Sequence, residues 1–339
     1  MLFDFSNVNT VWSSLLIETL NRLGLKTAII CPGSRSTPLT VALANHSQIE
    51  TIPVLDERSA AFFAMGIAKR RGTPVALICT SGTAGANFYP AIIEAKESRV
   101  SLLVFTADRP PELRNCHAGQ AIDQVKLYGH YCNWQTELSI PSIDIAMLRY
   151  LRQTMVFAWE RSLFPNPGVV HLNCPFREPL APIIVPEVQA SLIGFDGDNF
   201  LTGITDKKAF SASPFSSKYL KQWASYSQGI IIAGVAHTQD PKTYCQVIAK
   251  LSQYLNYPVL AEALSPVRNF ADLNPNLITT YDLILRNPNL AQKLIPDIVI
   301  QIGELPTSKE LRKWLEDIQP QHWIISSTAD NFDSLHNQT

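Results

Sequence analysis

The feature that most constrains the fold is the stretch of residues 54–87, VLDERSAAFFAMGIAKRRGTPVALICTSGTAGAN, which changes its hydrophobic pattern repeatedly. An apolar run ends at Leu55, and apolar side chains then recur at helical spacing until Gly72, a residue typical of a helix end. The continuous apolar run 74–79 is typical of a parallel strand buried on both faces. A turn at Ser81-Gly82 leads into the next helix. The stretch therefore predicts strand, helix, strand and helix of an open parallel sheet.

The same alternation continues along the chain. Further buried strands are expected at residues 27–31, 101–106 and 168–173, with amphipathic helices at 11–23 and 144–159. This order predicts an α/β fold, with a doubly wound, mainly parallel sheet and helices on both faces.

Composition divides the chain into domains. Residues 181–217 are rich in Pro, Gly, Ser and Asp, which is typical of a linker, and a second doubly wound α/β unit begins near residue 229. We therefore expect one domain over 1–180, a linker over 181–217 and a second domain over 218–339, with truncation of the last at its C-terminal end left open.

Composition also excludes several classes of protein. The 339 residues carry a formal net charge of −1, which gives no electrostatic reason to expect nucleic acid as a partner. No apolar run is long enough for a membrane span, and the first residues lack the pattern of a signal peptide. The six cysteines are single and the seven histidines scattered, which favours free thiols in the cytoplasm and disfavours a zinc site.

Two segments at predicted strand ends hold candidate functional residues. Glu57 follows a strand at the edge where open α/β sheets place ligands, although an acidic residue there also stabilises a helix start through the helix dipole. Ser34 and Arg35 follow the strand at 27–31. A turn with hydroxyls and a guanidinium suits a carboxylate, but spacing alone favours an ordinary helix cap. Both alternatives stay open on the residues alone.

The amino-acid sequences of these segments also resemble those of a known enzyme family. DERSAAFFAMGIAK and CTSGTAGANFYPAIIEA resemble the pyrimidine-binding domain of thiamine-diphosphate enzymes. Together with CPGSRSTPL, ADRPPEL and GQAIDQ, they are similar to the 2-succinyl-5-enolpyruvyl-6-hydroxy-3-cyclohexene-1-carboxylate synthases of menaquinone and phylloquinone biosynthesis. Related decarboxylases and acetolactate synthases usually carry His-Glu where this chain has Asp56-Glu57, which favours the synthases.

The resemblance implies roles for particular residues. Glu57 matches the catalytic glutamate that hydrogen-bonds the aminopyrimidine ring of the cofactor. The positions that match cofactor contacts are Glu57, Thr80, Ser81, Gly82 and Asn87. The positions that match substrate contacts are Ser34, Arg35, Arg109, Gln120 and Lys309. His117 and Glu310 depart from the family pattern and receive no role.

The resemblance also implies a reaction and its partners. The succinyl unit of 2-oxoglutarate is added to isochorismate with loss of CO2, using thiamine diphosphate and a magnesium or manganese ion, in a homodimer or dimer of dimers. The family has a third domain for the metal and the diphosphate, so we expect no metal site in this chain and no activity from residues 1–339 alone. The motif FDGDN around Gly197 is rejected as that metal site, because no strand precedes it. The alternatives are an acetolactate-synthase-like lyase and a non-catalytic binding module.

Overall fold

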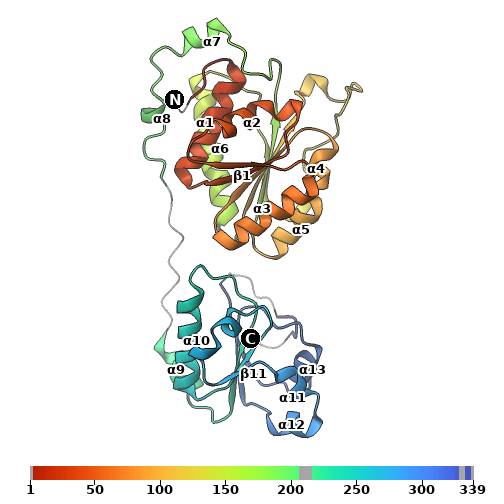
Figure 1. The fold of residues 1–339 in the computed structure, drawn as a ribbon, viewed down its shortest axis with the longest axis vertical. Coiled ribbons are helices and arrows are strands. Elements are labelled where there is room, and N and C mark those ends of the chain that lie inside the picture. Colours follow the sequence, from red (N-terminus) through yellow and green to blue (C-terminus); the bar gives the residue numbers. More distant parts are fainter. Residues whose placement is uncertain (1–2, 206–215, 328–332, 337–339) are drawn as a thin grey trace. The chain divides into compact units, whose positions relative to one another are not determined.

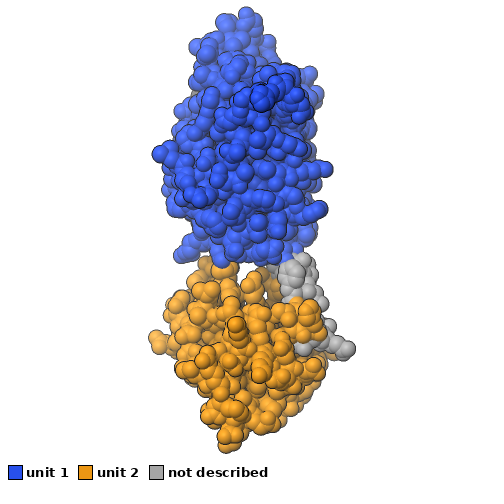
Figure 2. Space-filling model, turned by 90° about the vertical axis from the view of Figure 1, so that its right-hand side faces the viewer, with its two compact units in different colours: residues 1–209 blue, residues 210–339 orange. Residues whose placement is uncertain are grey.

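The chain forms two compact units, residues 1–209 and 210–339, in a computed structural model that describes residues 3–205, 216–327 and 333–336 (Figure 2). Each unit is an α/β domain built on one parallel sheet, as the sequence predicts. Within the described ranges, every helix is too short or too polar to cross a lipid bilayer.

Six parallel strands, in the order β2-β1-β3-β4-β6-β5, organise the first unit (Figure 1). Their bounds are Thr27–Ile30 (β1), Glu50–Pro53 (β2), Val75–Cys79 (β3), Leu102–Asp108 (β4), Cys132–Glu137 (β5) and Val169–Pro175 (β6). Strands β3 and β4 are buried along their whole length, which their continuous apolar runs predict. The sequence does not predict β5, because this edge strand is polar and all its residues are only half-buried.

Helices cover both faces of this sheet. Their bounds are Val8–Leu23 (α1), Thr37–Ala44 (α2), Glu57–Arg71 (α3), Thr83–Asn87 (α4), Tyr89–Glu97 (α5) and Ile145–Leu163 (α6), with 3-10 turns at Ser34–Ser36 (η1), Pro111–Leu113 (η2) and Gly129–Tyr131 (η3). One core lies between the sheet and α1, α2 and α6, and a second between the sheet and α3 and α5. Helix α3 ends at Gly72, whose φ of 65° is the left-handed cap that the sequence predicts.

The first unit continues past residue 180, where the composition predicts a linker. Helices α7 (Pro186–Ser191) and α8 (Gly197–Phe200) lie in this segment, and its Val188, Leu192 and Leu201 side chains are buried in the first core. The Asn7 side chain at the start of α1 donates to the carbonyl of Ala181 at 2.9 Å. Helix α1 is therefore buried on nearly every side, rather than amphipathic. The part of the predicted linker at 206–215 lies outside the described residues.

The second unit has five parallel strands in the order β11-β10-β7-β8-β9. Their bounds are Gly229–Ala233 (β7), Val259–Ala261 (β8), Leu277–Ile278 (β9), Ile298–Ile302 (β10) and Gln321–Ile325 (β11). The helices are Ser217–Trp223 (α9), Pro241–Leu255 (α10), Tyr281–Leu285 (α11), Pro288–Lys293 (α12) and Lys309–Ile318 (α13), with a 3-10 segment at Pro266–Leu273 (η4). Two apolar cores fill the two faces of this sheet.

The strand order of the second unit reverses between β7 and β10, the position where open α/β sheets bind ligands. Here the two following loops meet, because Val235 and Glu304 form an antiparallel bridge. A Cβ added at Gly234 would lie 1.7 Å from the carbonyl oxygen of Glu304. Backbone therefore fills the crevice between the ends of these two strands.

Candidate functional site

The loops that follow β1 and β3 approach each other closely at the carboxyl edge of the first sheet. A Cβ added at Gly33 would lie 2.5 Å from the Cβ of Thr80, so only glycine lets the two loops meet without a shift. Parallel pairing of β1 with β3 causes this proximity, since both strands end at the same edge. Two segments that the sequence assigns to substrate and cofactor thus lie side by side.

The turn after β3 also holds Arg109 and Gln120. Arg109 Nη1 donates to Ser81 Oγ at 2.5 Å and to the Gln120 carbonyl at 2.6 Å. Gln120 returns a hydrogen bond from its Nε2 to the Ser81 carbonyl at 3.0 Å. Gly82 adopts a φ of +82°, and a Cβ there would lie 2.8 Å from Gln120 Cγ. Four of the predicted site residues therefore form one connected group.

Arg35 follows Gly33 in the loop that contacts Thr80, and its guanidinium is bound by the segment just after β6. Its Nη1 donates to the Phe176 carbonyl at 2.9 Å and is 3.6 Å from Glu178 Oε1. Burial lowers the pKa of Arg35 and the Arg109 charge lowers it further, against the opposing effect of Glu178. Two guanidinium groups therefore lie at neighbouring loops of this edge, an arrangement suited to anionic groups. Ser34, the first residue of η1, is exposed beside them.

Glu57 is the first residue of α3 and is half-buried. The preceding Asp56 caps the helix, with Oδ1 accepting from the Ser59 N–H at 2.8 Å. Helix α3 packs against β1, so its first residue lies near the end of that strand. Burial and then the Glu57 and Asp56 charges raise the pKa of the Cys31 thiol, just after β1, to about 12. Glu57 is thus a carboxylate at the carboxyl edge of the sheet, where the sequence places it.

Two further predicted residues lie on other elements. Asn87 is exposed at the end of α4, and its Nδ2 donates to the Thr83 carbonyl at 2.9 Å. Lys309 is the first residue of α13 in the second unit, whose placement relative to the first is not determined. His117, which received no role, is exposed with a φ of 61°.

A polar network contacts the Ser81–Gly82 turn through Gln124, and the sequence does not predict it. Asn173 on β6 donates from Nδ2 to Asp108 Oδ2 and to Glu137 Oε2, each at 2.8 Å. Arg114 pairs with the same two carboxylates at 3.0 and 2.7 Å. Burial raises the pKa of Asp108, although Asn173 and Arg114 oppose the shift. The fifth member, Gln124, is fully buried, although the polar sequence of its loop is typical of solvated residues. Isolated polar residues in a loop have no periodic pattern that would predict burial.

The residues present fit one half of the cofactor that the resemblance implies. Glu57 is a half-buried carboxylate able to bond an aminopyrimidine, and the tight contact of Gly33 with Thr80 places the turn after β3 beside the loop after β1. In the described part of the chain, no group of three or more His, Cys, Asp or Glu side chains could hold a metal ion. Of the motif around Gly197, Asp196 caps α8 and Asp198 pairs with Arg22 on α1.

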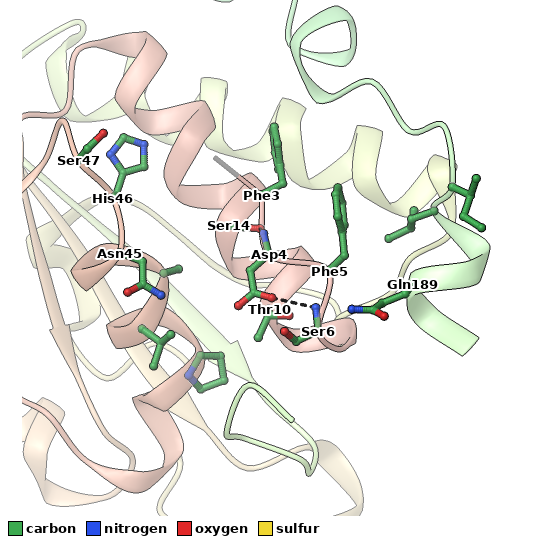
Figure 3. A pocket seen from close by; sticks show the side chains of 15 residues that line it. Phe3, Asp4, Phe5, Ser6, Thr10, Ser14, Asn45, His46, Ser47 and Gln189 are labelled. Carbon is green, nitrogen blue, oxygen red and sulfur yellow. Dashed lines mark hydrogen bonds between the residues drawn. The ribbon is translucent and has the colours of Figure 1, made fainter. Parts of the chain in front are cut away.

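The first unit also has a pocket of about 830 Å³ (Figure 3). Phe3 and Phe5 stand at its centre, with Asn45 and His46 on one side and Gln189 on the other. Its walls come from the N-terminal segment, α1, α2 and the segment around α7. It contains none of the predicted site residues.

Comparison with known proteins matches both units. Residues 11–127 match the family described as the thiamine pyrophosphate enzyme N-terminal TPP binding domain. Residues 204–339 match the family described as the middle domain of thiamine pyrophosphate.

Curated relatives match over the whole chain. A 2-succinyl-5-enolpyruvyl-6-hydroxy-3-cyclohexene-1-carboxylate synthase of Rippkaea orientalis is 65% identical over 339 residues, covering 100% of this chain and 57% of the relative. Synthases of the same name from Gloeothece citriformis and Crocosphaera subtropica are 65% and 63% identical, with 59% and 58% of their lengths covered. The chain thus spans less than three-fifths of these relatives and corresponds to their N-terminal portion.

Proposed function

Because the chain belongs to the thiamine pyrophosphate enzymes and has their N-terminal and middle domains in order, we propose that it supplies the N-terminal part of a 2-succinyl-5-enolpyruvyl-6-hydroxy-3-cyclohexene-1-carboxylate synthase. The first unit is the pyrimidine-binding domain in this proposal, and the second is the middle domain. The complete enzyme is a transferase of the carboligase type that joins the succinyl unit of 2-oxoglutarate to isochorismate and releases CO2.

The observation that carries the proposal is the placement of Arg35 and Arg109 at neighbouring loops of the sheet's carboxyl edge, since Gly33 contacts Thr80 and Arg109 bonds Ser81. Both substrates are dicarboxylates, and guanidinium groups bind carboxylates through paired charge-assisted hydrogen bonds. Arg109 is already oriented by Ser81 and Gln120, so little side-chain freedom is lost when an anion binds. Ser34 and Gln120 complete the substrate contacts of the first unit in this proposal, and Lys309 of the second unit is a substrate contact that the resemblance alone implies.

Glu57 and the turn after β3 form the cofactor side. Thiamine diphosphate, when bound, would supply a carbon nucleophile for the keto group of 2-oxoglutarate. The Glu57 carboxyl group would hydrogen-bond the aminopyrimidine ring and so favour one of its tautomers, and the resemblance assigns Thr80, Ser81, Gly82 and Asn87 as further cofactor contacts. A magnesium ion and the diphosphate belong to the part of the relatives that follows the matched region.

A second copy of the chain covers one exposed face of α3 in this proposal. Phe62 and Phe63 are 44% and 47% exposed, and with Ile67 and Arg70 they line an apolar groove of about 350 Å³. Leu55, just before α3, is 87% exposed. Apolar groups so exposed mark interaction surfaces, and the family resemblance implies a homodimer or dimer of dimers.

The six unpaired cysteines favour the cytoplasm as the compartment. The product enters menaquinone or phylloquinone biosynthesis, as the relatives' activity implies.

Two measurements test the proposal. We define the completed enzyme as this chain followed by the C-terminal part of the Rippkaea orientalis relative. With 2-oxoglutarate, isochorismate, thiamine diphosphate and Mg²⁺, the completed enzyme should release CO2 and form the named product, whereas residues 1–339 alone should not. Calorimetry should detect cofactor binding only in the completed enzyme. An acetolactate-like lyase would instead accept pyruvate alone, and a binding module would leave both proteins inactive; either result contradicts the proposal.

A further inference from the structure

We propose that Gln124 is a positioning residue that sets the direction of Arg109 through the Ser81–Gly82 turn. This inference rests on the proposed function, because Arg109 is a substrate contact only in that function. Nothing in the sequence pattern singles out Gln124, which is the second glutamine of the run GQAIDQ.

The Gln124 carboxamide is 1% exposed and joins three separate segments. Its Oε1 accepts from the Gly82 N–H at 2.8 Å. Its Nε2 donates to the Ala107 carbonyl at the end of β4, at 3.2 Å, and to Asn173 Oδ1 on β6, at 2.9 Å. One planar group thus fixes the turn after β3 relative to the ends of β4 and β6.

The turn that Gln124 holds is the one that orients the arginine. Ser81, the residue before Gly82, accepts from Arg109 through its hydroxyl at 2.5 Å and from Gln120 through its carbonyl at 3.0 Å. A shift of Gly82 would carry Ser81 with it, because the two share a peptide bond. Arg109 would then lose the partner that fixes one face of its guanidinium.

The Nε2 end of the Gln124 amide bonds Asn173, which has further hydrogen bonds of its own. Asn173 Oδ1 accepts from Thr106 Oγ1 at 3.0 Å as well as from Gln124, and its Nδ2 bonds the buried Asp108. Asp108 accepts from the Arg109 N–H through Oδ1 at 2.7 Å. The network therefore holds Arg109 at its backbone and, through Gln124 and Ser81, at its guanidinium.

The chemistry of this site requires an amide. An acceptor must face the Gly82 N–H while donors face two oxygens, those of Ala107 and Asn173. An ionised carboxylate fails the second condition, because it only accepts, whereas a protonated carboxyl group can accept from Gly82 and donate to Asn173. Gln124→Glu should therefore behave as a variant that recovers on acidification.

A double-mutant cycle in the completed enzyme separates positioning from general support of the fold. Arg109→Ala identifies the substrate whose KM depends on this arginine. For that substrate, Gln124→Met should raise the KM by about tenfold, the size expected for residues in one network, and should leave kcat within about threefold of the wild-type value. In the Arg109→Ala background, Gln124→Met should change that KM by less than about twofold, because its effect passes through Arg109. Additive effects on KM would overturn the proposal. If Arg109→Ala itself leaves KM unchanged, the proposed function fails at this residue instead.

A pH series provides the rescue. For Gln124→Glu, the raised KM should return toward the wild-type value as the pH falls from 8 to 6, since burial raises the pKa of the introduced carboxyl. Asp123→Ala is the matched control: Asp123 is exposed in the same loop and bonds only the Val125 N–H among the hydrogen bonds found in the described residues. It should show a wild-type KM across this range. A Gln124→Glu defect that does not change with pH would contradict the role of the amide.

Hydrogen exchange in residues 1–339, without any ligand, gives a readout that does not depend on activity. Gln124→Met should speed exchange at the peptide that contains Gly82, while strand β3 stays protected. Unchanged exchange at Gly82 would show that Gln124 does not hold the turn. Exchange that rises equally throughout β3 and β4 would indicate loss of the fold and would also overturn a positioning role.

Discussion

Acidification should weaken the first unit through one buried histidine, His171 on β6. Its Nε2 lies 2.8 Å from Thr106 Oγ1, and its ring packs edge-on against Tyr128 with centroids 4.7 Å apart. Burial lowers the pKa of His171 to about 4, whereas an unfolded histidine titrates near about 6.5. Between these two values the unfolded chain binds a proton that the folded chain does not.

The sign and size of the effect follow from linkage. The folded pKa of His171 is depressed, so its full contribution to stability is present above about pH 6.5 and is lost as the pH falls toward 4. The limiting loss is about 3 kcal/mol, from roughly 2.5 pKa units at 1.36 kcal/mol each. Between pH 8 and pH 5 the loss amounts to about 2 kcal/mol.

The measurement is urea unfolding at pH 8, 6.5 and 5, followed by hydrogen exchange of β4 and β6 peptides. These peptides report the first unit alone, which matters because His322 in the second unit also has a pKa lowered by burial. His171→Gln removes the titrating ring, so it should lose about 2 kcal/mol less than the wild type from pH 8 to pH 5. The exposed His130 gives the control, and His130→Gln should keep the wild-type slope. A His171→Gln variant as pH-sensitive as the wild type would refute the reasoning.

Three further predictions concern the site and the surface. In the completed enzyme, Glu57→Gln should keep the fold by circular dichroism but lose most turnover, and near-wild-type turnover would leave Glu57 as a helix-start residue only. Arg35→Ala and Arg109→Ala should each cost about 1.5–3 kcal/mol in kcat/KM while cofactor affinity in calorimetry stays close to wild type. Unchanged kinetic constants for both would leave these arginines with their structural hydrogen bonds alone and no substrate role. Phe63→Asp on α3 should lower the oligomeric state of the completed enzyme in sedimentation, and an unchanged state would place the subunit interface elsewhere.

The sequence predicted the fold where hydrophobic runs are continuous. Strand β3 and helix α3 follow from an apolar run and a helical period, because burial on a sheet or a helix face leaves a regular trace. Edge strand β5 left no such trace, since its polar residues are half-buried. The segment after residue 180 was predicted to be a linker because most of its residues are polar. Isolated apolar residues such as Val188 nevertheless attach it to the first core.

The candidate site shows a similar division. Resemblance indicated Ser81, Arg109 and Gln120, and the structure brings them within hydrogen-bonding distance of one another. The roles of these residues stay predictions. The sequence could not indicate Gln124 or Asn173, because their pairing joins segments separated by 49 residues. Only the folded chain shows that these two amides share a hydrogen bond.

Helix α1 is contacted at its start by residues that are translated much later, and this has a consequence for folding on the ribosome. The Asn7 and Asn9 side chains donate to carbonyls 168 to 176 residues further along, and the Ser6 carbonyl accepts from the Val185 N–H. At about 5–20 residues per second, roughly 10–35 s pass between translation of α1 and arrival of this segment. During that time α1, whose side chains are nearly all buried in the folded unit, lacks the segment that later contacts its first turn. A nascent chain paused before residue 185 is therefore the species that a chaperone would have to recognise.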